Sequence, residues 1–442
     1  GAMTVKNSGK LSSGTYTAKA GMMDITNQGT IENGTYTAGG ALTYDGNADS
    51  TVTETTMTGA QVDITNAGTL TNGSYTAETG AMTVKNSGTL SSGTYTAKAG
   101  TMGITNRKTI ENAAFTAGGA LTYDGNADST VTETTMTGAQ VDITNAGTLT
   151  NGSYTAETGA MTVKNSGKLS SGTYTAKAGM MDITNEGTVE NGNYTAETGA
   201  MTITNRGKLS SSTYTAKAGT MDITNEGTIE NGSHTAGGAM TITNHGKISD
   251  GSYKARKALR VYHAKDGTIS GGTFTGVDTT LINQADLSGA KVEGTKTLTV
   301  TNTASIQNAT LTGGAATVDN HGEDSVMKDV TLTGSAITLT NEGTVENGSY
   351  TAETGAMTVK NSGKLSSGTY TAKAGTMGIT NRKTIENAAF TAGGALTYDG
   401  NADSTVTETT MTGAQVDITN AGTLTNGSYT AETGAMTVKN SG

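Results

Sequence analysis

Apolar and polar residues alternate along short stretches of this chain, and the alternation restarts about every 20 residues. In residues 24–38, DITNQGTIENGTYTA, the apolar residues Ile25, Ile31 and Tyr36 stand between polar neighbours. Because successive side chains of a strand point to opposite faces, this alternation predicts short, half-buried β-strands. No 3.6-residue period is present, and Thr, Gly and Asn are poor helix formers. The sequence therefore predicts an all-β protein.

A triplet such as Thr35-Tyr36-Thr37 marks each repeat. Its centre recurs 22 times, at steps of 18 to 21 residues, and holds an apolar residue or, once, a histidine. Because this position selects apolar bulk without selecting one shape, we predict that it faces the interior and that the flanking Thr residues face solvent. The central residues are Tyr16, Tyr36, Met57, Tyr75, Tyr95, Phe115, Met136, Tyr154, Tyr174, Tyr194, Tyr214, His234, Tyr253, Phe274, Val292, Leu311, Leu332, Tyr350, Tyr370, Phe390, Met411 and Tyr429.

An asparagine recurs at a second fixed position, as in Asn27 of the segment MDITN. Met23, Ile25 and Asn27 share one strand face, so this asparagine is predicted to point inward at a corner of the coil. Asparagines stacked in successive coils form amide ladders, in which each side chain bonds the next. The position departs from Asn only at Gly46, Gly125, Gly400 and His263.

Short strands that repeat without helices predict a parallel β-helix, or β-solenoid, of about 20 residues per coil and about 22 coils. We expect the coils to be right-handed and, at ~4.8 Å per coil, to extend over roughly 105 Å. A larger unit of 79 residues is superimposed on the coils, since GAMTVKNSG begins at Gly1, Gly80 and Gly159 and again at Gly355 and Gly434. We predict one continuous solenoid over 1–442, with regular units in 1–236 and 346–442 and diverged coils in 237–345.

Composition supports a repeat architecture. The chain has 63 Gly, no Pro, Cys or Trp, and 33% hydrophobic residues. That apolar fraction is below the roughly 45–50% of globular domains, yet the strict spacing of apolar residues argues against disorder. A net charge of −10 argues against nucleic-acid binding. No apolar run of membrane-spanning length and no signal peptide is recognisable, so no membrane insertion of this segment is predicted.

Three copies of the segment LTYDGNADSTVTETTMTG contain the spacing Asp-x-Asn-x-Asp, which is typical of calcium loops. An EF-hand would place Glu at the twelfth position, where Thr56 stands instead; Glu54 comes two residues earlier. Asp, Asn and Gly are also the residues that any tight turn favours. A plain turn is therefore the favoured interpretation, and calcium is the alternative. The candidate calcium ligands are Asp45, Asn47, Asp49, Asp124, Asn126, Asp128, Asp399, Asn401 and Asp403.

Basic residues cluster in SYKARKALRVYHAKDG, which comprises residues 252–267. Such a cluster can bind acidic glycans or phosphates, although a solvated strand face is the simpler interpretation. It is the best local candidate for a contact site in an otherwise acidic chain. The candidate binding residues are Lys254, Arg256, Lys257, Arg260 and Lys265.

The sequence shows no catalytic constellation, and we predict that the protein is not an enzyme and needs no cofactor other than the calcium considered above. Outward aspartates such as Asp24 and Asp63 mostly skip coils, and the four histidines are dispersed. His234 occupies a triplet centre and His263 an Asn position, so both are interpreted as packing variants. No zinc spacing and no phosphate-binding loop is present. A carbohydrate-active enzyme is a third, less favoured class, and it would need acidic residues on adjacent coils.

The repeat DITNQGTIENGTYTA resembles the passenger regions of bacterial autotransporters and related haemagglutinin-like surface adhesins. The resemblance covers nearly every coil, and it implies a secreted or surface-displayed bacterial protein. We therefore expect an extracellular structural or adhesive protein that forms a stalk, a rod or a filament. Expected partners are further copies stacked end to end, a continuation of the same chain, and a host or matrix glycan or protein. The alternative is ice binding by the outward Thr columns, which mid-chain charges at Lys254, Lys291 and Glu293 would interrupt.

Overall fold

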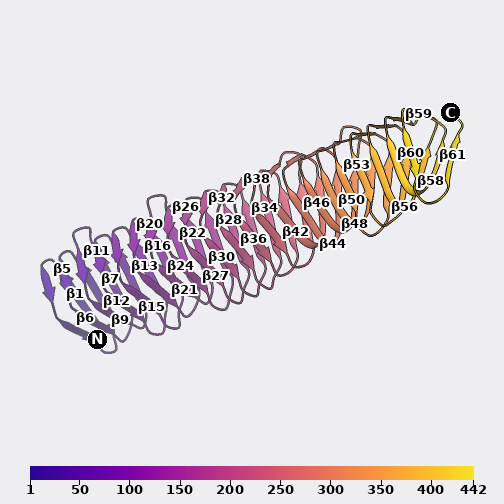
Figure 1. The fold of residues 1–442 in the computed structure, drawn as a ribbon. Coiled ribbons are helices and arrows are strands. Elements are labelled where there is room, and N and C mark those ends of the chain that lie inside the picture. Colours follow the sequence, from indigo (N-terminus) through magenta and orange to yellow (C-terminus); the bar gives the residue numbers. More distant parts are fainter. The chain divides into compact units, whose positions relative to one another are not determined.

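The computed structural model describes all of residues 1–442, which form parallel β-strands and no helix. It confirms an all-β parallel β-solenoid of about 22 coils. The chain divides into two compact units, Gly1–Met221 and Asp222–Gly442, and each is described by itself. Within each unit, successive coils stack as layers of parallel strands (Figure 1).

Each regular coil contains three strands, of five, three and four residues. In one coil these are β4 (Met23–Asn27), β5 (Thr30–Glu32) and β6 (Thr35–Ala38). In several coils of the second unit the four- and five-residue strands join into one long strand. The long strands are β42 (Thr273–Asn283), β44 (Lys291–Asn302), β46 (Thr310–Asn320), β48 (Thr331–Asn341), β56 (Ala389–Gly400) and β58 (Thr410–Asn420).

The strands stack in register, so each position of the repeat becomes a column. Strand β3 (Thr15–Ala18) pairs with β6, and Tyr16 is the partner of Tyr36. The triplet centres face the interior as predicted, and Tyr36 is fully buried. Their rings stack directly: the Tyr154, Tyr174 and Tyr194 centroids are separated by 4.6 and 4.5 Å. This spacing follows the separation of neighbouring strands, about 4.8 Å.

The corner asparagines form the predicted ladder. Asn165 Nδ2 donates to Asn185 Oδ1 at 2.8 Å and to the carbonyl oxygens of Gly167 and Thr188 at 3.0 and 3.2 Å. Its own Oδ1 accepts from Asn145 Nδ2 at 2.9 Å. The amide therefore satisfies backbone carbonyls at the corner as well as linking one coil to the next, which explains why the position rejects apolar residues.

Where glycine replaces the corner asparagine, a tyrosine takes over its role. Asn27 Nδ2 donates to the hydroxyl of Tyr44 at 3.4 Å, and that hydroxyl lies 3.5 Å from Ser50 Oγ. A Cβ on Gly46 would collide with both hydroxyl oxygens. The same substitution recurs in the third copy, where Asn381 bonds Tyr398 and Ser404 bonds Asn420. The glycine thus makes room for an alternative polar corner, and the sequence pattern did not reveal this exchange.

The turn before the triplet strand places a residue in the left-handed region, and in 20 of the 22 coils this residue is not glycine. Asn33 has φ of 52°, whereas Gly34 has no positive φ. A Cβ on Gly34 would instead meet the ring of Tyr36. The glycine therefore makes room for the ring of the tyrosine two residues later, and the turn itself does not require it.

Candidate functional site

The three candidate calcium loops are turns on the outside of their coils. Asp45 lies at the outward face of β7 (Leu42–Gly46), and Asn47 Oδ1 accepts the backbone N–H of Asp49 at 3.2 Å. This is the Asx-turn geometry of an ordinary tight turn. Glu54, with φ of 50°, occupies the same turn position as Asn33, after β8 (Thr51–Thr53), outside the loop.

The three loops differ in one charged neighbour. In the second copy Arg107 lies 3.7 Å from the Asp124 carboxylate, and in the third Arg382 donates to Asp399 at 2.9 Å. In the first copy the residue that corresponds to these arginines is Gln28. The structure shows no group of three or more acidic or histidine side chains arranged to hold a metal. Calcium binding at these loops stays a prediction, and the arginines disfavour it in the second and third copies.

The basic coil, which we define as residues 252–266, consists of β39 (Ser252–Ala255), β40 (Leu259–His263) and the corner that follows. The five predicted basic residues are all exposed, and none forms an ion pair with an acidic side chain. The coils on both sides are uncharged at the paired positions: Thr235 and Thr275 flank Lys254, and Thr241 and Thr280 flank Arg260. The structure therefore brings the predicted cations together along one coil.

The neighbours of Arg256 explain why the positive charge of this coil is not neutralised. Its position in the repeat is that of Lys98, Lys177, Lys217 and Lys373, each of which pairs with a glutamate of the preceding coil at 2.6–2.8 Å. In the coil before Arg256, the residue at the glutamate position is Gly237. Arg256 therefore lacks the glutamate that forms an ion pair with each of the equivalent lysines.

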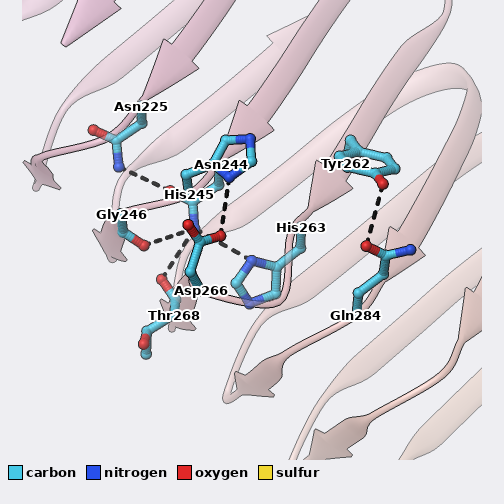
Figure 2. A network of polar contacts seen from close by, with 9 residues as sticks. All are labelled: Asn225, Asn244, His245, Gly246, Tyr262, His263, Asp266, Thr268 and Gln284. Carbon is cyan, nitrogen blue, oxygen red and sulfur yellow. Dashed lines mark hydrogen bonds and ion pairs between the residues drawn. The ribbon is translucent and has the colours of Figure 1, made fainter. Parts of the chain in front are cut away.

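Tyr262 is a residue that the sequence reasoning missed. It lies on β40 with 38% of its surface exposed, and it is the only strongly exposed aromatic residue in the chain. Figure 2 shows its hydroxyl directed at Gln284, to whose Oε1 it donates at 3.2 Å. The sequence could have indicated that Tyr262 is exposed, because it alternates with the inward Val261 and His263. It occupies neither of the two positions at which tyrosines are buried, namely the triplet centre and the strand position of Tyr44.

The corner beside Tyr262 contains two histidines with different roles (Figure 2). His263 replaces the ladder asparagine: Asn244 Nδ2 lies 3.3 Å from its Nδ1, and its Nε2 lies 3.1 Å from the carbonyl of Asp286. Only a neutral ring with hydrogen on Nε2 satisfies both partners. Burial lowers the pKa of His263, which also favours that form. His245 pairs with Asp266 at 2.9 Å on the surface and lowers the pKa of that carboxyl.

His234 is expected to make its coil acid-sensitive. It is fully buried against Tyr253, with ring centroids 4.7 Å apart, and burial lowers its pKa to about 3. Because the unfolded value is about 6.5, its stabilising contribution is complete above about pH 6.5 and declines as the pH falls toward 3. Hydrogen exchange of residues 233–244 should accelerate over this range, and His234→Tyr should remove most of that dependence. An unchanged pH dependence in His234→Tyr would contradict this assignment. Because burial also lowers the pKa of His263, the variant His263→Asn measures separately how much of the dependence comes from that histidine.

No charged residue interrupts the outward Thr columns of the first unit. The position after each triplet centre is Thr in every coil of that unit, and these residues pair in register from coil to coil. The column before the centre contains Thr, Ser, Ala and Asn but no charge. The charges that interrupt the grid, at Lys254, Lys291 and Glu293, all lie in the second unit.

Surface hollows are small and follow the repeat. Three of them, with volumes of about 220–240 Å³, lie beside equivalent lysines, namely Lys6, Lys85 and Lys164. A fourth, of about 360 Å³, lies over Gly378 and is bordered by Asp399 and Asp417. These two aspartates stand on adjacent coils, but Asp399 is already paired with Arg382.

No family model matches this chain, and no curated protein is similar to it in sequence. Of the resemblance described above, the structure supports the β-solenoid repeat fold. The structure contains no helical segment with the length and hydropathy of a membrane span.

Proposed function

We propose that this protein is a non-enzymatic structural repeat protein of the bacterial surface or the extracellular space, where its solenoid forms a stalk or fibre. The observation that carries the proposal is that, within each unit, equivalent positions of successive coils pair in register. Interior tyrosines stack on like residues, and corner asparagines bond the next asparagine. Such a fold extends by adding equivalent coils, so it provides length and a repeated surface. The surface location rests on the adhesin-like repeat and stays an expectation.

End-to-end association is part of this proposal. In the last coil, β61 (Met436–Asn440) leaves Met436 and Val438 43% and 50% exposed. Strand β61 pairs with β58 on one side only, and a strand edge of this kind is a template for further pairing. Residues 414–433 repeat 139–158, and residues 1–27 repeat 159–185. A second copy could therefore add its first coil through pairs that already exist inside the protein, such as Tyr154 with Tyr174.

A chain that ends at Thr433 tests the proposal. In the full chain, residues 434–442 occupy the layer that residues 1–9 of a second copy would need, since both read GAMTVKNSG. We expect the shortened chain to form longer fibres, and at lower concentration, when both are viewed by electron microscopy. Tyr429→Asp in the shortened chain is the matched control, because a charge at that interior position should block stacking. Discrete particles from both chains at every concentration would contradict end-to-end association.

Ice binding by the first unit is a second candidate, favoured by the unbroken Thr column. Thr residues on alternate positions are roughly 7 Å apart along a strand and about 4.8 Å apart between coils, a regular grid of hydroxyl and methyl groups. Thermal hysteresis of the full chain is the test. If Thr96→Lys and Thr137→Lys together leave the hysteresis unchanged, or none is present, the candidate fails.

A further inference from the structure

The basic coil is the one place where unpaired cations and an exposed aromatic ring occur together. Lys254, Arg256, Lys257 and Arg260 follow one another along β39, the turn and β40. At ~3.3 Å per residue, Lys254 and Arg260 are separated by at most about 20 Å along the coil. With uncharged paired positions above and below, the positive charge forms a line across one face.

A line of charge selects a linear ligand. The packed elements include the carboxylates of Asp266 and Asp278. Asp266 pairs with His245 and Asp278 accepts a hydrogen bond from Thr297 at 2.7 Å, and neither carboxylate forms an ion pair with the four cations. Glu293, two coils further on, lies 3.9 Å from Lys291. The four cations are therefore available to an external anion with several charges spaced along its length.

Tyr262 adds a second kind of contact beyond this charge. Its paired neighbours are Thr243 on one side and the half-buried Ile282 on the other. The hydrogen bond to Gln284 holds the phenol, so the ring does not have to be ordered when a ligand binds. An exposed ring with an adjacent amide and an apolar side chain suits the face of a sugar ring, whose C–H groups are apolar and whose hydroxyls need donors and acceptors.

We propose that the basic coil binds an acidic polysaccharide, with Tyr262 against a sugar ring and the cations along its carboxylate or sulfate groups. Single-stranded nucleic acid is less suited, since such sites stack successive bases on several aromatic residues and this face has one. The inference deepens the proposed function and rests on the extracellular location, where such polymers occur.

The experiment measures binding of the full chain to two probes, a heparin oligosaccharide and polygalacturonate, with neutral dextran and single-stranded DNA for comparison. The double variant Lys254→Thr/Arg260→Thr places on this coil the residue that both neighbouring coils carry, so the strand should be retained. We expect it to weaken binding by about tenfold or more and to flatten the salt dependence. Lys85→Thr/Lys164→Thr removes the same charge in the first unit and should leave binding unchanged.

Tyr262→Thr separates sugar recognition from charge. It should weaken binding to the acidic polysaccharide several-fold while leaving the salt dependence as it is. Equal binding of DNA and polysaccharide with no effect of Tyr262→Thr would overturn the inference in favour of a general polyanion contact. Absence of binding, or equal loss in both charge variants, would also overturn it. Fibre assembly is measured on the same proteins. A protein that binds the polysaccharide but forms no fibres would contradict the proposed structural role and leave this inference intact.

Discussion

Replacing Gly152 by alanine is expected to destabilise its coil by about 1–3 kcal/mol, the usual cost of overpacking a core. Gly152 has no positive φ, so the backbone itself would accept alanine. A Cβ there would collide with the hydroxyl and ring of Tyr154. Hydrogen exchange of residues 147–158 would report the local free energy of opening, which in a repeat protein is more informative than a global midpoint.

A second substitution should rescue the first. Tyr154→Phe removes the hydroxyl, which is buried without a hydrogen-bond partner, so that change alone should cost little. In the double variant Gly152→Ala/Tyr154→Phe we expect most of the lost stability to return. The chain contains this combination naturally, as Ala113 with Phe115 and Ala388 with Phe390. Additive losses in the double variant would show that the collision is not the cause.

One natural coil refines this prediction. Ser212 precedes Tyr214, so a Cβ is tolerated there. Its Oγ accepts the Gly192 N–H at 3.1 Å and donates to the Ser210 carbonyl at 3.0 Å. These bonds offset the crowding, so Gly152→Ser should be milder than Gly152→Ala. The reverse order would contradict the explanation.

The largest single effect is expected at the asparagine ladder. Asn165→Leu keeps the side-chain size but leaves the Gly167 and Thr188 carbonyls and Asn185 Oδ1 without the donor they share, at 3.0, 3.2 and 2.8 Å. The Gly167 carbonyl keeps its bond from the Thr188 N–H at 2.9 Å, so the cost falls on the Thr188 carbonyl and Asn185 Oδ1. At about 1–3 kcal/mol for each buried polar group left short of a partner, a local loss of roughly 2–6 kcal/mol is expected. Amide hydrogen exchange should accelerate in the coil that contains Asn165 and in the coils on both sides of it.

The exposed Asn193 provides the control for this experiment. Asn193 occupies an outward triplet position between Thr173 and Thr213. Asn193→Leu should change local stability by less than about 0.5 kcal/mol. If Asn165→Leu costs no more than Asn193→Leu, the ladder does not stabilise the solenoid.

The fold could be predicted from sequence because each coil repeats the same inward positions. Tyr36, Ile25 and Asn27 recur at fixed spacing, and a strand has only two faces. The exchange of Asn for the Tyr44 and Ser50 hydroxyls could not be predicted, since it depends on how far a side chain reaches from a different position. The role of Gly34 was hidden for the same reason, because it depends on where the Tyr36 ring lies.

The candidate site was predicted in part. Strand alternation placed Lys254 and Arg260 on the outer face, and the structure brings them onto one line. That they are not neutralised depends on the preceding coil, which places Thr235 beside Lys254 and Thr241 beside Arg260. Strand alternation also places Tyr262 on the outer face, and the structure adds that every other tyrosine and phenylalanine is at least partly covered.

Distances between spin labels on the Thr column of the first unit test the central claim most directly. The chain has no cysteine, so pairs can be introduced at Thr37 with Thr96, Thr137 or Thr175, which lie three, five and seven coils apart. An in-register solenoid predicts separations of about 14, 24 and 34 Å, rising by ~4.8 Å per coil. Separations that do not increase linearly with coil number would contradict the stacked, in-register architecture from which every other inference here is drawn.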